Sequence, residues 1–246
     1  MRKIVIVGAT SHIARKCIEI WNREPIEITL IARDSQKLDI IRDDIIASNE
    51  KSSVTCIITE LDNPQNIKKI LDDLQTLSST DNVLIAHGTL PDNEQSQSNV
   101  EKIYNDLHIN AISPIIFLEC LVGKMKNNEK SNIAIIGSVA GDRGRKSNYI
   151  YGSAKGMIET YVEGLQHRLA DSSLSITLIK PGPTETPMTM NFKSKVLKLA
   201  DSRKVARDII EGIRRNKPIV YTPTKWKYIM MIIKLLPRFI FNKLDI

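Results

Sequence analysis

Cysteines are few in this 246-residue chain, and the three present form no recognisable motif. Cys17, Cys56 and Cys120 are odd in number, lie far apart and include no Cys-x-x-Cys pair. This argues against a disulfide framework or a zinc site and suits a reducing compartment. The first residues run directly into an apolar segment without a secretory leader pattern. We therefore expect a cytoplasmic protein and predict no metal site.

Glycine and proline are also sparse. The chain has 11 glycines and 10 prolines, too few for a fibrous or low-complexity protein. No internal repeat of ~20–50 residues is found. An apolar fraction of 42% is enough for a sizeable core, so we predict one globular domain.

Acidic residues are nearly missing from the C-terminal part of the chain. Between Arg203 and Lys243 there are 11 Lys or Arg residues and two acids, Asp208 and Glu211, which leaves 35 − 11 = 24 basic and 28 − 2 = 26 acidic residues elsewhere. The net charge of +7 therefore belongs to this segment. Long aliphatic residues interrupt its cations, and it has no helix-turn-helix or aromatic RNA-binding motif, so we expect no nucleic-acid partner.

Short apolar runs with many β-branched residues recur along the chain. They are nearly continuous rather than alternating, as expected for strands buried on both faces of a parallel sheet. Helical periodicity separates them, most clearly from Tyr151 to Leu169. This alternation predicts a doubly wound α/β fold, whose ligands bind beyond the carboxyl ends of the strands. The expected strands are Lys3–Val7, Ile26–Ile31, Val54–Ile58, Asn82–Ala86, Asn132–Gly137, Leu174–Ile179 and Pro218–Tyr221.

The turn after the first expected strand suits a dinucleotide. Gly8 permits a tight turn, and the helix that follows offers free backbone N–H groups to a pyrophosphate. We predict contacts from Gly8, Thr10, Ser11, His12 and Ile13, although His12 is also compatible with a solvated turn residue. The usual Gly-x-Gly-x-x-Gly fingerprint is not present.

The second expected strand ends in Ile31-Ala32-Arg33-Asp34. An acid at this strand end would bind the ribose hydroxyls of NAD, whereas an arginine accommodates the 2′-phosphate of NADP. Arg33 therefore favours NADP(H) over NAD(H). The alternative is that Arg33 is an ordinary surface residue.

Tyr151 and Lys155 lie four residues apart, on one face of a helix. A nearby ammonium is expected to lower the pKa of a tyrosine, which is otherwise near 10. The same spacing recurs at Tyr221 and Lys225, but Pro223 makes that copy unlike a helix. Only the first copy follows a strand that ends in Gly137-Ser138. There the serine hydroxyl can reach the same substrate oxygen as the Tyr151 hydroxyl.

These landmarks resemble the short-chain dehydrogenase family. Asn110 lies where the family keeps an Asn that orders a water near the Lys, and Pro181-Gly182 matches its Pro-Gly turn. The glycine-rich loop departs from the family pattern because only Gly8 is retained, with His12 and Ala14 at the other glycine positions. The resemblance implies a single-domain Rossmann-like sheet with strand order 3-2-1-4-5-6-7.

The resemblance also implies site residues and a division of the chain. Residues 1–200 would form the NADP(H)-binding catalytic core, and 201–246 a basic, apolar arm of the same domain. The catalytic set is Asn110, Ser138, Tyr151 and Lys155, with Tyr151 giving a proton to a carbonyl oxygen while the nicotinamide gives a hydride. Besides the residues already named, Tyr151 and Lys155 among them, the cofactor contacts are Leu61, Asp62, Ala86, His87, Gly88, Pro181, Gly182, Thr184 and Thr186.

Two stretches suggest a narrower substrate. The loop after Ser138 carries Arg143, Arg145 and Lys146, and the tail 225–244 mixes cations with aromatic and aliphatic residues. Both resemble the reductase subunits of decaprenylphosphoryl-ribose 2-epimerases. This implies reduction of a lipid-linked keto sugar in cell-envelope polysaccharide synthesis, with a partner oxidase. Ser138, Tyr151, Arg143 and Arg145 would contact the substrate. Arg143, Arg145 and Lys146 suit the binding of a phosphodiester.

The apolar part of the tail is far shorter than the ~20 residues of a spanning helix, and its flanking cations suit a helix lying in an anionic membrane interface. A pocket lid or an oligomer contact is the alternative for the tail, and we expect a homodimer or homotetramer. Two other functions stay open: reduction of a soluble ketone or 3-oxoacyl substrate, and a non-catalytic NADP(H)-sensing module.

Overall fold

The computed structural model describes residues 1–74, 77, 79–125, 130–189 and 199–244. Its centre is a parallel sheet of seven strands in the order β3-β2-β1-β4-β5-β6-β7, which confirms the predicted fold class and strand order. The strands are β1 Arg2–Val7, β2 Ile26–Ala32, β3 Ser53–Ile58, β4 Asn82–Ile85, β5 Asn132–Ile136, β6 Ser175–Pro181 and β7 Ile219–Thr222.

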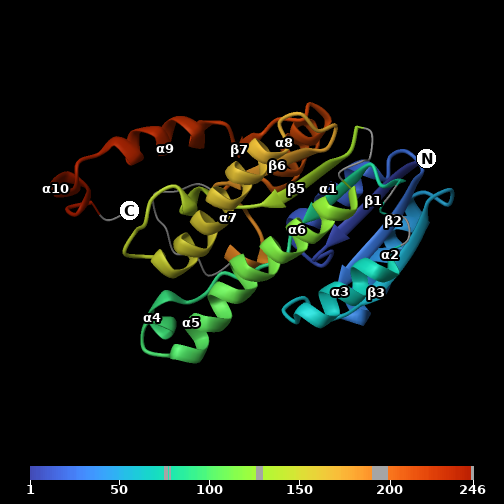
Figure 1. Cartoon of the computed structure of the whole chain (residues 1–246), viewed down its shortest axis with the longest axis horizontal. Coiled ribbons are helices and arrows are strands. Elements are labelled where there is room, and N and C mark those ends of the chain that lie inside the picture. Colours follow the sequence, from blue (N-terminus) through green and yellow to red (C-terminus); the bar gives the residue numbers. More distant parts are fainter. Residues whose placement is uncertain (75–76, 78, 126–129, 190–198, 245–246) are drawn as a thin grey trace.

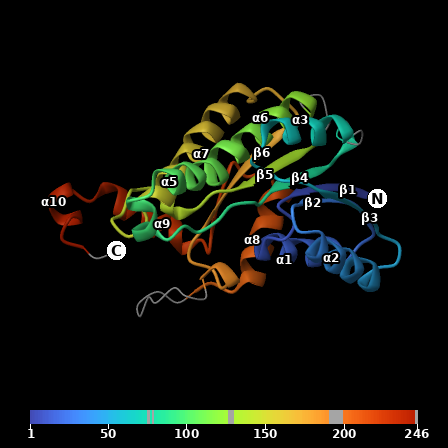
Figure 2. The ribbon, with the colours of Figure 1, turned by 90° about the horizontal axis from the view of Figure 1, so that it is seen from below.

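Helices cover both faces of the sheet (Figures 1 and 2). One face carries α3 (Pro64–Asp73), α5 (Val100–Leu107), α6 (Ser113–Met125) and α7 (Tyr149–Arg168). The other carries α1 (His12–Trp21), α2 (Ser35–Ser48) and α8 (Ser202–Arg214). Each layer has its own apolar core, centred on residues such as Phe117 and Ile158 on the first face and Trp21 and Ile209 on the second.

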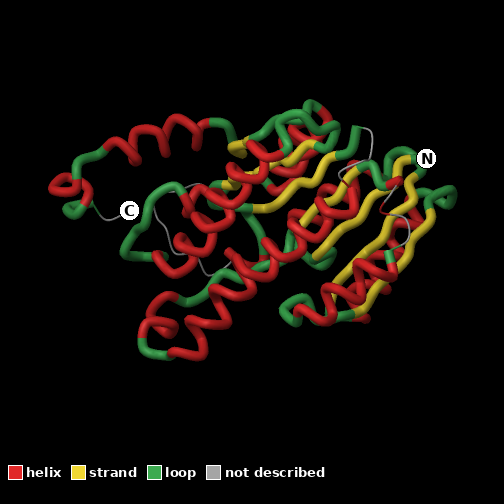
Figure 3. Tube along the Cα trace, viewed as in Figure 1, coloured by secondary structure: helices red, strands yellow, loops and turns green. Residues whose placement is uncertain are grey.

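The remaining elements lie near the carboxyl ends of the strands or beyond them. They are α4 (Asn93–Gln97), the π-helical turn η2 (His108–Ile112), the 3₁₀ turns η3 (Val139–Gly141) and η4 (Pro187–Thr189), and the terminal helices α9 (Lys225–Leu235) and α10 (Arg238–Phe241). Figure 3 shows α9 and α10 as the last helical segments, extending away from the sheet. Pro237 directly precedes α10, where the fixed φ angle of proline suits the start of a helix.

The register of the sheet brings the predicted site segments to one edge. Val7 of β1 is paired with Ile31 of β2 and with Ile85 of β4. Ile136 of β5 is paired with Ile179 of β6. The loops that follow these strands therefore begin at the same level, and they include the nucleotide turn, Arg33, Gly88, Ser138 and the Pro-Gly turn.

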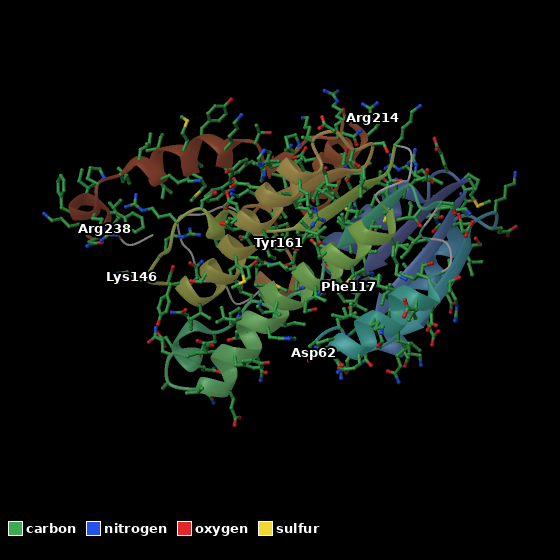
Figure 4. All side chains as sticks on the ribbon, in the orientation of Figure 1. Asp62, Phe117, Lys146, Tyr161, Arg214 and Arg238 are labelled. Carbon is green, nitrogen blue, oxygen red and sulfur yellow. The ribbon has the colours of Figure 1, made fainter. Side chains whose placement is uncertain are left out.

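The helical stretch Val100–Met125 is long and apolar enough to cross a membrane, but half of its apolar window is buried inside the protein. Phe117, for example, is fully buried between α6 and the sheet (Figure 4). This stretch is therefore explained as a core helix that covers the sheet.

Candidate active site

The turn after β1 fits a pyrophosphate. Gly8 has a φ of +84°, and a Cβ atom there would lie 2.5 Å from the backbone nitrogen of His87, so glycine is required. At the start of α1, Ser11 makes no side-chain capping bond and the first turn holds no acid. The helices α2, α3 and α8, by contrast, are capped by Asp34, Asn63 and Asp201. The uncapped N–H groups of α1 therefore suit an anionic ligand.

Arg33 is exposed directly after β2, where the 2′-phosphate of NADP would bind. Its neighbour Asp34 is engaged elsewhere, because its carboxylate accepts the Lys37 N–H at 3.0 Å and pairs with Lys37 Nζ at 2.7 Å. In the part of the chain that the structure describes, Arg33 has no ion-pair partner within 4.0 Å. This arrangement leaves the guanidinium available to a phosphate.

The two histidines of the predicted cofactor site have protein partners. His12 Nε2 lies 3.1 Å from Ser202 Oγ at the start of α8, and partial burial, with nearby cations, lowers its pKa. His87 is 9% exposed, with Nε2 2.9 Å from Ser113 Oγ and its ring edge against Phe117. The ring of His87 therefore points into the core while its backbone borders the nucleotide turn at Gly8, and the cofactor contact of His87 stays a prediction that its backbone can meet.

The remaining predicted cofactor residues line the same edge. Leu61 and Ala86 are buried, and Asp62 and Thr10 are more exposed. The Leu61 carbonyl accepts the Ser113 hydroxyl, which ties it to the His87 network. At the end of β6, Pro181 and the following Gly182 are buried, and Thr184 donates to the Gly182 carbonyl at 2.8 Å. Thr186 closes this turn through its N–H, which donates to Thr189 Oγ1 at 3.1 Å.

Ser138, Tyr151 and Lys155, which are predicted to be catalytic, come together from the start of η3 and from α7. Lys155 is 4% exposed, and its Nζ donates to the Ile136 carbonyl at 3.1 Å and lies 5.6 Å from the centroid of the Tyr151 ring. Ser138 precedes η3, where its hydroxyl accepts the Ala140 N–H at 3.1 Å. The second Tyr–Lys copy is not a site of this kind, because Tyr221 lies in strand β7 and its hydroxyl donates toward Asp142.

The electrostatics of the pair differ from the sequence-based expectation. Burial raises the pKa of Tyr151 to about 12, and a hydrogen bond with Ser138 only partly opposes this shift. Burial also lowers the pKa of Lys155 to about 8. The prediction that Lys155 lowers the pKa of Tyr151 is therefore wrong here, because desolvation dominates. The phenol stays protonated at neutral pH, which is the form that donates a proton.

Asn110 lies in the π-helical turn η2 and is fully buried. Its Oδ1 accepts the Thr89 N–H at 2.9 Å, and its Nδ2 donates to the Asp106 carbonyl at 2.9 Å. Gly88 has a φ of +153°, and a Cβ there would lie 2.9 Å from Asn110 Oδ1 and 3.6 Å from Lys155 Nζ. Asn110 therefore holds the chain after β4 beside the Lys155 ammonium.

Arg143, on the loop after Ser138, makes contacts with the C-terminal helices that its sequence position did not predict. Its guanidinium donates to the carbonyl oxygens of Ile233 and Leu236 at the end of α9 and lies 3.8 Å over the Phe241 ring. Nη1 of Arg143 is therefore bound by the carbonyl oxygens at the helix end, and its contact with a phosphodiester stays a prediction. Arg145 has a buried Nε without a hydrogen-bond partner, and burial lowers its pKa. Lys146 is exposed on the same loop.

A buried ionic cluster beside the site was missed from the sequence. Lys180 of β6 is 1% exposed and is paired with Asp142 and, at 2.6 Å, with Glu159 of α7. Burial alone would lower the pKa of Lys180, but the hydrogen bonds to Asp142 and Glu159 outweigh it and raise the pKa. The only signal in the sequence was a lysine inside an apolar strand, Leu178-Ile-Lys180-Pro.

A tyrosine one helical turn before a buried lysine, with a serine at the neighbouring strand end and an uncapped helix N-terminus nearby, is an arrangement that suits nicotinamide-dependent chemistry. The short chain dehydrogenase family model matches residues 2–197. The chain belongs to the short-chain dehydrogenase family.

Two relatives support this assignment. An uncharacterized oxidoreductase of Mycobacterium tuberculosis (strain H37Rv) is 25% identical over 161 residues, which are 65% of this chain and 64% of that protein. The chain thus spans less than two thirds of that relative. An uncharacterized oxidoreductase of Staphylococcus aureus (strain N315) is 21% identical over 216 residues, covering 87% of this chain and 92% of the relative.

Solved structures share the fold. A short-chain dehydrogenase from Sphingobium yanoikuyae, in complex with NADPH, superposes with a TM-score of 0.83 at 18% identity, covering 97% of both chains. The bulky-bulky ketone specific alcohol dehydrogenase from Comamonas testosteroni gives 0.80 at 18% identity, covering 97% of this chain and 96% of the other. At this identity the likeness shows the fold alone.

Burial of His87 generates a prediction about acid stability. It lowers the pKa of His87 to about 3, mainly through desolvation, whereas an unfolded histidine titrates near 6.5. Below pH ~6.5 the unfolded chain binds a proton that the native protein excludes, so stability falls as the pH drops toward 3, by up to about 1.4 kcal/mol per pH unit. We expect His87→Gln to remove this part of the pH dependence.

The measurement is urea unfolding of both proteins at a series of pH values between about 7 and about 4. Equal slopes of unfolding free energy against pH in wild type and His87→Gln would contradict a buried neutral imidazole.

Proposed function

We propose that this enzyme is an NADPH-dependent carbonyl reductase. The observation that carries the proposal is the Ser138–Tyr151–Lys155 arrangement, in which a protonated phenol is hydrogen-bonded to a serine hydroxyl beside a buried ammonium. A nicotinamide bound at this strand edge supplies the hydride.

Each catalytic side chain has a role that follows from its surroundings. The Ser138 hydroxyl orients the carbonyl oxygen, and Tyr151 gives that oxygen its phenolic proton. Lys155 has a pKa of about 8, which is close to neutral pH, and it can therefore return a proton to Tyr151. Asn110 is a positioning residue, since it fixes Gly88 and Thr89 next to the ammonium.

Replacing Tyr151 by Phe removes the proton donor and keeps the ring. We expect kcat to fall by ~10²–10⁴-fold, the usual contribution of a general acid, with little change in NADPH affinity. The matched control is Tyr161→Phe on the same helix, whose hydroxyl donates to Glu119 of α6 at 2.5 Å, away from Ser138 and Lys155 in its hydrogen bonding. Assays of ketone-dependent NADPH oxidation and fluorescence titration with NADPH measure both quantities. Substantial turnover in Tyr151→Phe would refute the assignment.

The preference for NADPH is proposed from Arg33. The exposed guanidinium and the engagement of Asp34 by Lys37 favour a phosphate at the end of β2, and the related Sphingobium enzyme was solved with NADPH. We expect Arg33→Ala to weaken NADPH binding by ~10–100-fold, the size of a charge-assisted hydrogen bond, and to leave NADH binding nearly unchanged.

Arg42→Ala is the control, because Arg42 lies on α2 and is paired with Asp39 and Asp43. Titrations of both nucleotides into the three proteins decide the question. Equal loss of NADPH and NADH affinity in Arg33→Ala, or equal affinities in the wild type, would show that Arg33 does not read the 2′-phosphate.

For the substrate we propose an anionic keto sugar linked to a polyprenyl phosphate, as the resemblance of the loop and the tail implies. Arg145 supports this, because it has a buried Nε without a partner on the loop that follows Ser138, with exposed Lys146 next to it. Figure 4 shows Lys146 at the same end of the molecule as Arg238 of the C-terminal helices. The partner oxidase, the cytoplasmic location and the homodimer or homotetramer stay predictions.

Substrate panels test this directly. We expect NADPH oxidation with a polyprenyl-phosphate keto sugar, and ~10-fold or greater loss of kcat/KM in Arg145→Met, with little loss on an uncharged soluble ketone. Faster turnover of soluble ketones or 3-oxoacyl thioesters by the wild type would favour the alternative reductase. Tight NADPH binding without turnover of any of them would indicate a sensing module.

A further inference from the structure

The C-terminal helix α9 has two apolar faces, and the protein covers only one of them. Trp226 and Met230 are buried and pack with Val139, while Ile229 and Ile233 are partly buried beside them. The opposite face carries Tyr228, Met231, Ile232 and Leu235, which are 59%, 55%, 59% and 78% exposed. In α10, Phe239 is 70% exposed. We call residues 225–244 the C-terminal arm.

The position of the C-terminal arm is fixed by contacts with the body of the protein. Gly182 leaves room for the Trp226 ring, since a Cβ there would lie 1.9 Å from its Nε1. At the other end of α9, Arg143 binds the last carbonyl oxygens, and Lys234 Nζ lies 3.8 Å from the buried carboxylate of Asp142. These contacts hold the inner face of α9 against the protein, and Tyr228, Met231, Ile232 and Leu235 stay exposed on the other face.

The charge of the C-terminal arm indicates which partner suits this face. No acidic residue occurs between Gly212 and Leu244, and the arm carries five cations, which are Lys225, Lys227, Lys234, Arg238 and Lys243. A second copy docking through the same face would bring these cations against each other, which is unfavourable. An anionic lipid surface offers both an apolar phase and opposite charge.

We propose that the C-terminal arm binds the surface of an anionic lipid bilayer. α9 would lie in the plane of the interface, with Met231, Ile232 and Leu235 directed toward the acyl boundary and the lysines at the level of the lipid phosphates. An 11-residue helix is ~16 Å long, about half of the hydrocarbon thickness, so the arm lies on the membrane and does not cross it. The C-terminal arm extends from the body in both ribbon views (Figures 1 and 2), which leaves its outer face accessible.

This inference goes beyond the reductase activity, because vesicle binding needs no turnover. It also places the loop that carries Arg145 next to the bilayer, since Arg143 of that loop is bound to the end of α9.

Vesicle co-sedimentation of the full chain tests the proposal. We expect the wild type to bind vesicles of phosphatidylglycerol and phosphatidylcholine, to bind pure phosphatidylcholine at least ~10-fold more weakly, and to lose affinity at high salt. The double variant Ile232→Ser/Leu235→Ser is expected to bind ~10-fold or more weakly, because its apolar contact is removed. Val100→Ser on α5, where Val100 is 82% exposed, is the matched control and is expected to bind as the wild type does.

The cationic contribution is tested separately. Each of Lys225→Gln and Lys227→Gln is expected to weaken binding by ~5-fold, whereas Lys69→Gln on α3 leaves it unchanged. Tyr151→Phe is expected to bind vesicles as the wild type does, so failure of the proposed chemistry is distinguished from failure of this inference.

Absence of wild-type binding to the anionic vesicles at low salt would overturn the proposal. Unchanged binding in the arm variants would do so too. A dimer in solution that Ile232→Ser/Leu235→Ser converts to a monomer, without vesicle binding by the wild type, would assign the face to a second copy instead.

Discussion

The active site depends on the burial of one charged group, the Lys155 ammonium. At 4% exposure it is removed from water, and its described hydrogen bond goes to the Ile136 carbonyl at 3.1 Å. Burying an ammonium is unfavourable unless polar groups surround it, and the desolvation lowers its pKa to about 8. The local fold is arranged around this group. Gly88 lies close on one side, and Gly141 allows η3 to approach the α7 backbone at Lys155 on the other.

A second buried charge, the Lys180 ammonium, holds together the elements around the loop after Ser138. Lys180 links the sheet to Glu159 of α7 and to Asp142, which directly follows η3, and Asp142 in turn faces Tyr221 and Lys234. Buried ion pairs of this kind contribute little net stability because both partners lose their hydration. Their effect is geometrical. The loop after Ser138, the end of β6 and the C-terminal arm are held in one fixed relation by these contacts.

Strand positions and strand-end residues could be predicted from the sequence because they depend on local patterns. Buried parallel strands read as continuous apolar runs, and the seven expected strands agree with the observed ones to within two residues. Gly8, Arg33, Ser138 and Gly182 then follow from topology, which brings strand ends to one edge. The direction of a long side chain does not follow in this way. Arg143 binds the end of α9, some 90 residues further along the chain, and nothing in its own loop specifies that contact.

Burial was the other quantity that local patterns did not supply. The Tyr-x-x-x-Lys spacing suggested a lowered phenol pKa from charge proximity, but the packing of η3 on α7 makes desolvation the larger effect at Tyr151. The ring of His87, directly after β4, fills a core position beside Phe117, while the His87 backbone lies at the nucleotide turn. Both outcomes depend on the density of tertiary packing, which a single sequence does not specify.

In the proposed mechanism, hydride passes from a bound nicotinamide to a carbonyl carbon at Tyr151. Reduction of a ketone with NADPH that carries deuterium at both C4 positions of the nicotinamide tests this step. The proposed mechanism requires one deuterium, delivered from a single face of the nicotinamide, on the carbinol carbon of each product molecule. An alcohol product that contains no deuterium from the labelled nucleotide would contradict it.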